Sequence, residues 1–370
     1  MQKETITILG CGWLGLPLAQ ALVKEGYSVK GSTTREEKLE VLQEAGVEPY
    51  LIRLDPEVTG DDIVAFLQSD ILVVNIPPTR RDDIVEFHIE QFSSLIDALG
   101  QSPVRSVLMV SSTSVYPSLN REVTEEDAVD PESPSGQALL LVEEMLMQES
   151  GFQSTVLRFG GLVGYDRNPE KYLTALTAVT NPDQPMNLIH RDDCIKIISE
   201  IIRLQQWGEV FNACSPNHIL RRDYYGRAAD AAGVPRLPLA PTAEPAPFKV
   251  VNSDKLVNAL GYETCFKMKA GRDRSQPITA EMIAQAKENL ILRRETHLDQ
   301  LVDKLKEDRV RRVIEPMLRG DDLSDTVSQE DLQYAIDLGL VRRTPAGPQI
   351  ANPVYREIIP HEGRRMKDEG

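Results

Sequence analysis

The chain has 370 residues, 41% of them hydrophobic, with 41 basic against 57 acidic side chains and a formal net charge of −16. The length predicts more than one domain, and the hydrophobic share supports a sizeable core. The negative charge repels nucleic-acid backbones and anionic lipids, so neither is a favoured partner. The four cysteines lack the spacing of zinc sites or disulfide frameworks. With no leader pattern and no apolar stretch of about 18 residues, we expect a cytoplasmic protein without a metal or a membrane span.

The amino-terminal residues combine a strand pattern, a glycine-rich turn and a helix pattern. Ile6, Ile8 and Leu9 form an apolar run, and helical spacing follows at Leu14, Leu18, Leu22 and Val23. In a G-x-G-x-x-G turn between a strand and a helix, the first glycine allows the turn, the second lets a diphosphate approach the backbone, and the third permits close packing. The N–H groups at the helix start would face the phosphates. The predicted contacts of a dinucleotide are therefore Gly10, Gly12, Trp13, Leu14 and Gly15.

The second predicted strand, residues 27–31, is followed by residues that favour a phosphorylated ribose. Sites that prefer NAD place an Asp or Glu at this point. This chain instead has Ser32, Thr33, Thr34 and Arg35. A guanidinium can hold a 2′-phosphate through paired hydrogen bonds, so NADP(H) is favoured over NAD(H), with Thr34 and Arg35 as contacts. The alternative is that Thr34 caps a helix while Arg35 is solvated.

Apolar strand patterns alternate with helix patterns in the segments that follow. Further strands are predicted at residues 49–54, 71–76, 106–110 and 154–159. This alternation predicts an α/β fold with a Rossmann-type doubly wound parallel sheet. Asp55, Pro77 and Pro78 follow strands, at the edge where such a sheet presents ligand-binding loops, and they are candidate cofactor contacts. Equally, Asp55 fits a turn cap and the two prolines fit strand ends.

Four more segments occur in an order that is specific to one family. They are residues 110–116 (VSSTSVY), 158–164 (RFGGLVG), 187–193 (NLIHRDD) and 211–212 (FN). With the glycine turn, this series resembles the extended short-chain dehydrogenases and reductases, the nucleotide-sugar epimerase and dehydratase group. The resemblance covers residues 1–266 and implies a cofactor domain at 1–178, interleaved with a lobe at 179–266 for a small polar or sugar-derived substrate. Residues 249–261 look like the family's terminal segment, in which a short helix packs on that lobe.

The resemblance implies chemistry by a Ser, a Tyr and a Lys four residues after the Tyr. Ser112 matches the Ser, and its neighbour Ser111 is a predicted cofactor contact. Ser135 and Leu139 stand where the Tyr and the Lys are expected, so the usual proton donor is missing. The acidic pair of the dehydratases is absent as well, which disfavours dehydration. The chain thus resembles the atypical branch of the family, which keeps the cofactor fold without the Tyr and the Lys.

Three other side chains are candidates on the same grounds. Tyr116, on the loop of Ser112, could replace the missing acid, although a Tyr at this place is common in the family as a non-catalytic wall of the pocket. His190 matches a position that is usually structural. Arg158 fits either a buried pair with a carboxylate or a contact with substrate phosphate. Ser112 and Tyr116 are therefore the predicted catalytic residues.

Dense mixed charge marks the carboxyl-terminal region as a separate module. The sequence predicts a linker at 267–277 and a mostly helical, winged-helix-like module at 278–370, with amphipathic helices up to Leu318, a helix from Ser328 to Gly339 and a hairpin at 341–351. This module resembles the tail of bacterial AAA-like ATP-binding proteins. The chain has no G-x-x-x-x-G-K-[ST] loop, so ATP hydrolysis is not expected. Because the charge is mixed, a protein partner or a fused remnant without a function of its own is favoured over DNA binding.

Two functions fit these residues. The first is an NAD(P)(H)-dependent oxidoreductase or epimerase-like enzyme, which the Ser112 loop and the lobe motifs favour. The alternative is a non-catalytic NADP(H)-binding sensor that signals through the module at 278–370, which Ser135 and Leu139 favour. In either case the resemblance implies a monomer or a homodimer.

Overall fold

A computed structural model describes residues 3–165, 167, 169, 173–241, 246–261, 307–319, 327–337, 340–344 and 347–350. The chain divides into two compact units, Met1–Gly271 and Arg272–Gly370, and the division falls within the predicted linker at 267–277. The linker itself and the helices predicted between residues 278 and 306 lie outside the described residues. Each unit is considered by itself below.

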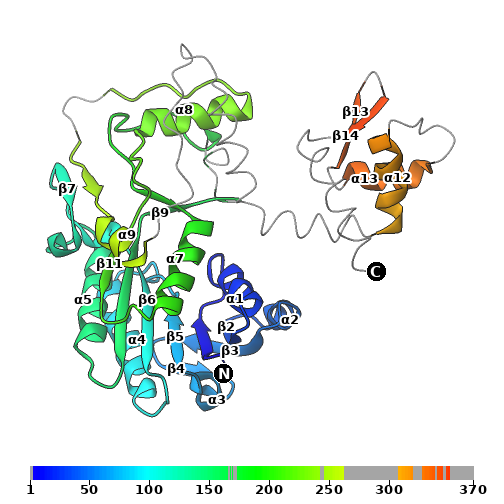
Figure 1. Cartoon of the computed structure of the whole chain (residues 1–370). Coiled ribbons are helices and arrows are strands. Elements are labelled where there is room, and N and C mark those ends of the chain that lie inside the picture. The colour runs from blue at the N-terminus through cyan, green and yellow to red at the C-terminus, as the bar shows by residue number, and fades with distance from the viewer. Residues whose placement is uncertain are drawn as a thin grey trace. The chain divides into compact units, whose positions relative to one another are not determined.

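The first unit is built on one eight-stranded sheet (Figure 1). Its strands are β1 (Thr5–Leu9), β2 (Ser28–Thr33), β3 (Glu48–Leu54), β4 (Val58–Gly60), β5 (Ile71–Val74), β6 (Ser106–Ser112), β8 (Gln153–Phe159) and β11 (Val210–Ala213). They lie in the order β11-β8-β6-β5-β1-β2-β3-β4, and all neighbours pair in parallel except β3 with β4. After β1 the chain forms β2, β3 and β4 on one side of β1, and β5 then pairs with β1 on the other side. This reversal is the switch point of a doubly wound sheet, so the predicted fold class is confirmed.

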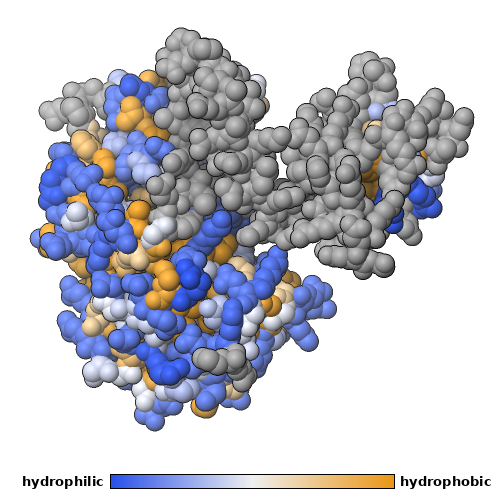
Figure 2. All heavy atoms as spheres, viewed as in Figure 1, coloured by the Kyte–Doolittle hydropathy of each residue, from blue (hydrophilic) through white to orange (hydrophobic). Residues whose placement is uncertain are grey.

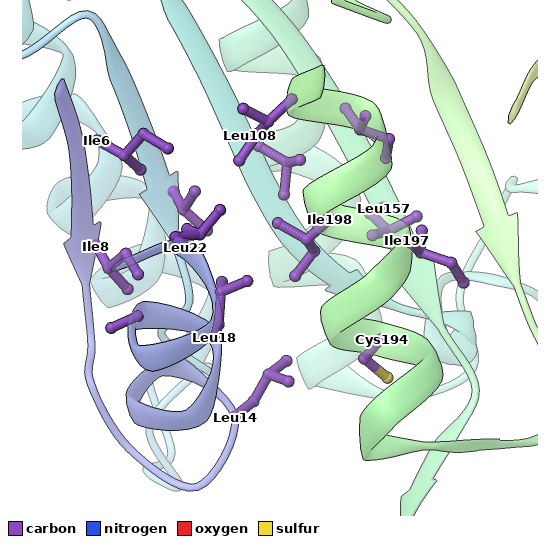
Figure 3. Packing of buried hydrophobic residues seen from close by; sticks show 14 of the residues in the cluster. Ile6, Ile8, Leu14, Leu18, Leu22, Leu108, Leu157, Cys194, Ile197 and Ile198 are labelled. Carbon is purple, nitrogen blue, oxygen red and sulfur yellow. The ribbon is translucent and has the colours of Figure 1, made fainter. Parts of the chain in front are cut away.

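Helices cover both faces of this sheet because each presents one apolar face to it. One face carries α1 (Gly15–Lys24), α2 (Leu39–Glu44), α7 (Arg191–Leu204) and α9 (Asp254–Leu260), and the other carries α3 (Ile63–Leu67), α4 (Ile84–Leu99) and α5 (Pro134–Gln148). In Figure 3, Leu18 and Leu22 of α1 lie opposite Ile198 of α7, with strand residues such as Ile6 and Leu108 beside them. Burial of this kind contributes about 1.5–3 kcal/mol for each large side chain.

The short helix α9 packs on elements of the segment that was predicted as the lobe. Residues 249–261 do contain a short helix, but its buried residues Leu256 and Leu260 belong to the core formed by α1, α7 and the strands. The helix contacts α7 and β11, which lie within the segment 179–266 predicted as the substrate lobe but belong to the main sheet and the helices that cover it. The helical spacing of the apolar residues in α9 predicts which side of the helix is apolar. Which element that side meets depends on the path of the chain after β11.

Smaller elements stand at the carboxyl ends of the main strands. Two parallel two-stranded sheets form, one from β9 (Gly161–Val163) with β10 (Leu188–His190) and one from β7 (Arg121–Val123) with β12 (Lys249–Val251). Helix α8 (Arg221–Ala232) packs Ala228 and Ala229 against Leu173 in a separate small cluster. Ala228 and Ala229 lie within the segment predicted as the substrate lobe, whereas Leu173 precedes it, and α7 and β11 of the same segment join the main sheet.

The second unit has its own apolar core. Its described elements are α12 (Asp308–Arg319), α13 (Gln329–Asp337), β13 (Val341–Thr344) and β14 (Gly347–Ile350). Val310, Val313 and Ile314 of α12 pack against Leu332 and Ala335 of α13. The strands β13 and β14 pair in antiparallel fashion, which confirms the predicted hairpin, and α13 begins directly after Ser328 as predicted.

The surface of the first unit is mixed in character. Figure 2 shows hydrophilic residues over much of the margin of its visible face and hydrophobic residues toward the middle. Within the described residues, no helix is long and apolar enough to cross a membrane.

Candidate cofactor and substrate site

The glycine turn lies between β1 and α1, at the switch point of the sheet. Gly10 has a φ of +102°, a conformation that L side chains rarely adopt, and a Cβ there would lie 2.6 Å from the carbonyl oxygen of Asn75. A Cβ on Gly15 would lie 2.2 Å from the Gly10 oxygen. In contrast, a Cβ on Gly12 would meet nothing within 4 Å. Gly10 and Gly15 are thus required by the fold, whereas Gly12 faces open space.

Two polar side chains hold this turn in place. The Gly10 N–H donates to the Ser32 hydroxyl at 2.9 Å, and the Asn75 amide donates to the Gly10 oxygen at 3.0 Å. The Cys11 N–H donates to the Ser32 carbonyl at 2.8 Å. Ser32, near the end of β2, therefore stabilises the turn by accepting hydrogen bonds through its hydroxyl and its carbonyl. The Cys11 thiol is buried, which raises its pKa to about 12, so it has no role as a nucleophile.

Trp13 joins the turn to residues that are distant in sequence. The guanidinium carbon of Arg167 lies 4.2 Å from its ring centre, and that of Arg191 lies 4.9 Å from it. Arg191, the first residue of α7, also donates to the Trp13 carbonyl at 3.3 Å and stacks on the Tyr165 ring at 4.1 Å. Two positive charges therefore lie beside the turn at which the sequence predicts a diphosphate.

At the end of β2, Thr34 and Arg35 are exposed, as a cofactor contact requires. The short helical turn at Glu36–Lys38 receives no side-chain cap, so the alternative role of Thr34 as a cap is not observed. It is the Thr33 hydroxyl that accepts the Arg35 N–H, at 3.2 Å. Thr34 and the predicted Asp55 line one hollow of about 460 Å³, together with Arg53, Thr79 and Arg81. Arg53 was not predicted, because nothing in its local sequence marks it as a ligand.

The loop after β5 carries Pro77 and Pro78 and leads to α4. Its next residues, Arg80 and Arg81, line a second hollow of about 460 Å³ with Pro134 and Ser135 at the start of α5. Ser135, at the position expected for the Tyr, thus borders open space, whereas Leu139, at the position of the Lys, is only 4% exposed. The first turn of α5 also approaches the Ser112 loop closely, since a Cβ on Gly136 would lie 2.3 Å from the Ser114 oxygen.

Ser112 ends β6 at the carboxyl edge of the sheet and is half-buried. Its hydroxyl oxygen accepts the Ser114 N–H at 3.2 Å, so its own hydrogen remains available for a substrate oxygen. Ser111 is placed differently. It is 5% exposed, and its hydroxyl donates to the Glu143 carboxylate, so the side chain that was predicted to touch cofactor is used inside the protein.

Tyr116 is enclosed by the protein. Its side chain has no exposed surface, its hydroxyl donates to Asn212 at 2.6 Å, and the hydroxyl oxygen accepts from Arg158 at 2.8 Å. Burial raises the pKa of Tyr116 to about 12. A hydroxyl in this setting neither meets substrate nor gives up its proton near neutral pH, so the geometry does not fit the predicted acid and instead fits a structural role.

Arg158 belongs to the same buried network as Tyr116. Its guanidinium forms an ion pair with Glu143 at 2.6 Å, and both side chains are almost fully buried. Burial raises the pKa of the Glu143 carboxyl, and the contacts with Arg158 oppose that shift. Of the two alternatives, the buried carboxylate partner is the one observed.

His190 also has a structural place. Its Nδ1 accepts the Asp192 N–H at 3.2 Å and so caps α7, and the ring is 7% exposed. A Cβ on Gly164, the residue after β9, would lie 2.6 Å from its Nε2, which shows how closely the backbone approaches the ring there. The interpretation of this histidine as structural therefore agrees with its position.

Lys249, like Arg53, is a residue near the site that was not predicted from the sequence. It lies on β12, and its ammonium group donates to the carbonyl of Tyr116. Burial lowers its pKa, while the nearby Glu132 carboxylate acts in the opposite direction. Its contact partner is 133 positions away in sequence, so no local pattern could have shown it.

These residues fit a bound dinucleotide. The turn has no side chain at Gly12 to block a diphosphate, and the helix that follows it presents N–H groups without intrahelical partners. The turn, the ends of β2 and β3, and the Ser112 loop all lie at the carboxyl edge of a doubly wound sheet, where such proteins bind ligands. Fold and site together define a Rossmann-type dinucleotide-binding protein.

Comparison with known proteins agrees with this class. The model of the NAD dependent epimerase/dehydratase family matches residues 6–214, more than half of the chain, and the chain belongs to this family. It is 30% identical to Protein YeeZ of Escherichia coli over 262 residues, which are 70% of this chain and 95% of that protein.

Solved structures show the same fold. A UDP-glucuronic acid 4-epimerase from Bacillus cereus in complex with NAD aligns with a TM-score of 0.60 and 20% identity, covering 70% of this chain and 93% of the epimerase. A short-chain dehydrogenase/reductase superfamily protein from Agrobacterium tumefaciens with bound NAD gives a TM-score of 0.58 at 18% identity, covering 78% and 98%.

Proposed function

We propose that this protein is an oxidoreductase or epimerase-like enzyme that prefers NADP(H) and acts on a small polar or sugar-derived substrate. The observation that carries the proposal is the pairing of an open glycine turn with a half-buried serine at the same sheet edge, Gly12 and Ser112. Family membership and the NAD complexes of similarly folded proteins support a nicotinamide cofactor. When bound, this cofactor would supply hydride transfer.

The protein's own groups would bind and orient. The N–H groups around Trp13 and Leu14 would hold the diphosphate, and Arg191 would offset its charge from the start of α7. Ser112, already an acceptor for the Ser114 N–H, would donate its hydrogen to the substrate oxygen and polarise it. Arg35, exposed after β2, would favour the 2′-phosphate of NADP(H).

The first experiment is calorimetric titration of the protein with NADPH and with NADH. NADPH should bind more tightly, and Arg35→Ala should weaken NADPH more than NADH. Equal affinities of the wild type for the two dinucleotides would reject the phosphate preference.

The second experiment follows nicotinamide absorbance over a panel of small sugars, sugar nucleotides and hydroxy acids. Ser112→Ala should lower turnover about 100-fold, because it removes a donor aimed at the reacting oxygen, while dinucleotide binding stays within about twofold. Ser102→Ala is the matched control, since its hydroxyl donates to the Leu99 carbonyl before β6 begins. Turnover that is insensitive to Ser112→Ala would remove this serine from the mechanism.

A non-catalytic NADP(H)-binding sensor that signals through the C-terminal module is a second candidate. The burial of Leu139 and Tyr116 favours it, because neither position offers a proton donor at the crevice. This candidate predicts tight NADPH binding without turnover on the panel. It also predicts that NADPH changes the rate at which a protease cuts within Arg272–Gly370. An unchanged cleavage rate would count against it.

A further inference from the structure

Arg53, near the end of β3, is one of several described arginines that form no ion pair with a carboxylate of the described residues. Many arginines whose side chains the structure describes form ion pairs with carboxylates, namely Arg81, Arg105, Arg121, Arg158, Arg203, Arg222, Arg236, Arg309 and Arg312. Within the described residues, Arg53 and Arg35 have no such carboxylate. In a chain with a net charge of −16, two guanidinium groups without an acidic partner at one sheet edge are available for an anion.

The pairing of the strands places these two arginines at matching positions beyond the last paired residues of two neighbouring strands. Strand β2 lies parallel to β3 with Thr33 beside Leu51, so Arg35 and Arg53 each follow that pair by two positions. The backbone of Arg35 is still extended, with φ −125° and ψ 122°. The Arg53 guanidinium lies 3.5 Å from the carbonyl oxygen of Thr34, the residue between Thr33 and Arg35. Arg53 therefore reaches the end of β2 from the neighbouring strand.

The hollow at this point has a mixed lining. Arg53 supplies positive charge, and Arg81 contributes little more because Asp83 already binds it through two contacts. Asp55, on the same hollow, is an acceptor suited to hydroxyl or amino groups. A ligand that offers a phosphate to Arg53 and hydrogen-bond donors to Asp55 matches this lining, which is the chemistry of a phosphorylated nucleoside and not that of inorganic phosphate alone.

We propose that Arg53 is a specificity-determining residue that binds the phosphomonoester on the nucleoside half of the cofactor, the 2′-phosphate of NADP(H), together with Arg35. This inference rests on the proposed function, because it needs the dinucleotide to lie along the carboxyl edge of the sheet. It adds a second phosphate contact that comes from β3, not from the residues directly after β2.

The test compares Arg53→Ala with the wild type by titration with NADPH, NADH, 2′,5′-ADP and 5′-AMP. The variant should bind NADPH and 2′,5′-ADP about tenfold or more weakly, and NADH and 5′-AMP within about twofold of wild type, because only the first two carry the 2′-phosphate. Arg53→Lys should recover part of the loss, since it keeps the charge without the paired donors. Arg105→Ala is the matched control. It is an exposed arginine at the opposite end of the strands, directly before β6, and should change none of the four affinities.

The possible failures can be distinguished. If the wild type binds neither dinucleotide, the proposed function is wrong. If it binds NADPH and Arg53→Ala leaves the ratio of NADPH to NADH affinity unchanged, only the role of Arg53 is wrong. Arg53 is exposed, so its replacement should leave the melting temperature within about 2 °C of wild type, and any loss of binding can be assigned to the lost contact.

Discussion

Arg158 and Glu143 form an ion pair of 2.6 Å with side chains that are only 6% and 3% exposed. The pair ties β8 to α5, and through Ser111 and Tyr116 it extends to the two ends of the Ser112 loop. Desolvation makes such a pair costly to form, and removing one partner leaves the other charge buried without compensation. The network is therefore a structural support of the serine loop.

Breaking this pair should destabilise the protein strongly. Arg158→Leu is expected to lower the free energy of unfolding by about 3–5 kcal/mol, because the Glu143 carboxylate would remain buried without its partner. Urea denaturation measures this loss. The double variant Arg158→Leu, Glu143→Leu should be closer to wild type than the single one. Arg203→Leu, at a pair in which the arginine is 58% exposed, should cost less than about 1 kcal/mol. A loss of that small size at Arg158 would contradict the interpretation.

Tyr116→Phe should affect stability and leave chemistry unchanged. The variant loses the hydroxyl between Asn212 and Arg158, which should cost about 1–3 kcal/mol because a buried amide and a guanidinium lose a partner. Turnover on any substrate found should stay within about threefold of wild type at a temperature where the variant is folded. Thermal unfolding and steady-state kinetics on the same sample make the comparison. A large loss of turnover without a loss of stability would restore Tyr116 as an acid.

The two glycines Gly12 and Gly15 should respond in opposite ways to alanine. Gly12→Ala should leave the melting temperature within about 2 °C of wild type, since its Cβ meets no atom within 4 Å, yet it should weaken dinucleotide binding at least about tenfold. Gly15→Ala should destabilise the fold, because its Cβ would lie 2.2 Å from the Gly10 oxygen. Thermal unfolding and calorimetry together separate the two effects. Normal binding by Gly12→Ala would move the diphosphate away from this turn.

Buried His88 should make stability fall at mildly acidic pH. Burial lowers its pKa below the ordinary value of 6.5, and its Nε2 has no hydrogen-bond partner among the residues that the structure describes. Above that value both the folded and the unfolded states keep the ring neutral. As the pH falls below it, the unfolded state binds a proton before the folded state does, so the unfolding free energy decreases until the pH reaches the lower pKa of the folded state.

The measurement compares wild type with His88→Leu, which cannot bind that proton. Urea denaturation between about pH 7.5 and about pH 5.5 should show a smaller loss of stability in the variant. His218, whose pKa burial also lowers, is present in both proteins and contributes equally to each. Parallel pH profiles would show that His88 does not titrate differently on folding.

The order of strands and helices in the first unit followed from local patterns. Apolar runs located β1, β5, β6 and β8, because strands that are buried on both faces consist largely of apolar residues, and β3 was located although its burial alternates along the strand. The glycine turn was also predictable, because the backbone around Gly10 and Gly15 leaves no room for a side chain at either position. Local sequence does not determine which element an apolar helix face will meet, so the sequence did not show that α9 joins the core of the main sheet through α7 and β11.

The site was less predictable because its contacts join distant residues. Tyr116 meets Asn212 across 96 positions and Arg158 across 42, and only these partners show that its hydroxyl is used internally. Arg53 reaches Thr34 through strand pairing. In both cases the residue type was visible in the sequence, whereas its surroundings depend on the register between strands.

The packing of α9 also bears on how the protein is made. Leu256 and Leu260 complete the core that contains residues as early as Ile6 and Leu14. A ribosome must therefore deliver almost the whole first unit before α9 can cover the apolar side of α7 and β11, and until then that side stays open to chaperones or to aggregation. The second unit emerges only afterwards and has an apolar core of its own, so it can fold beside a finished neighbour.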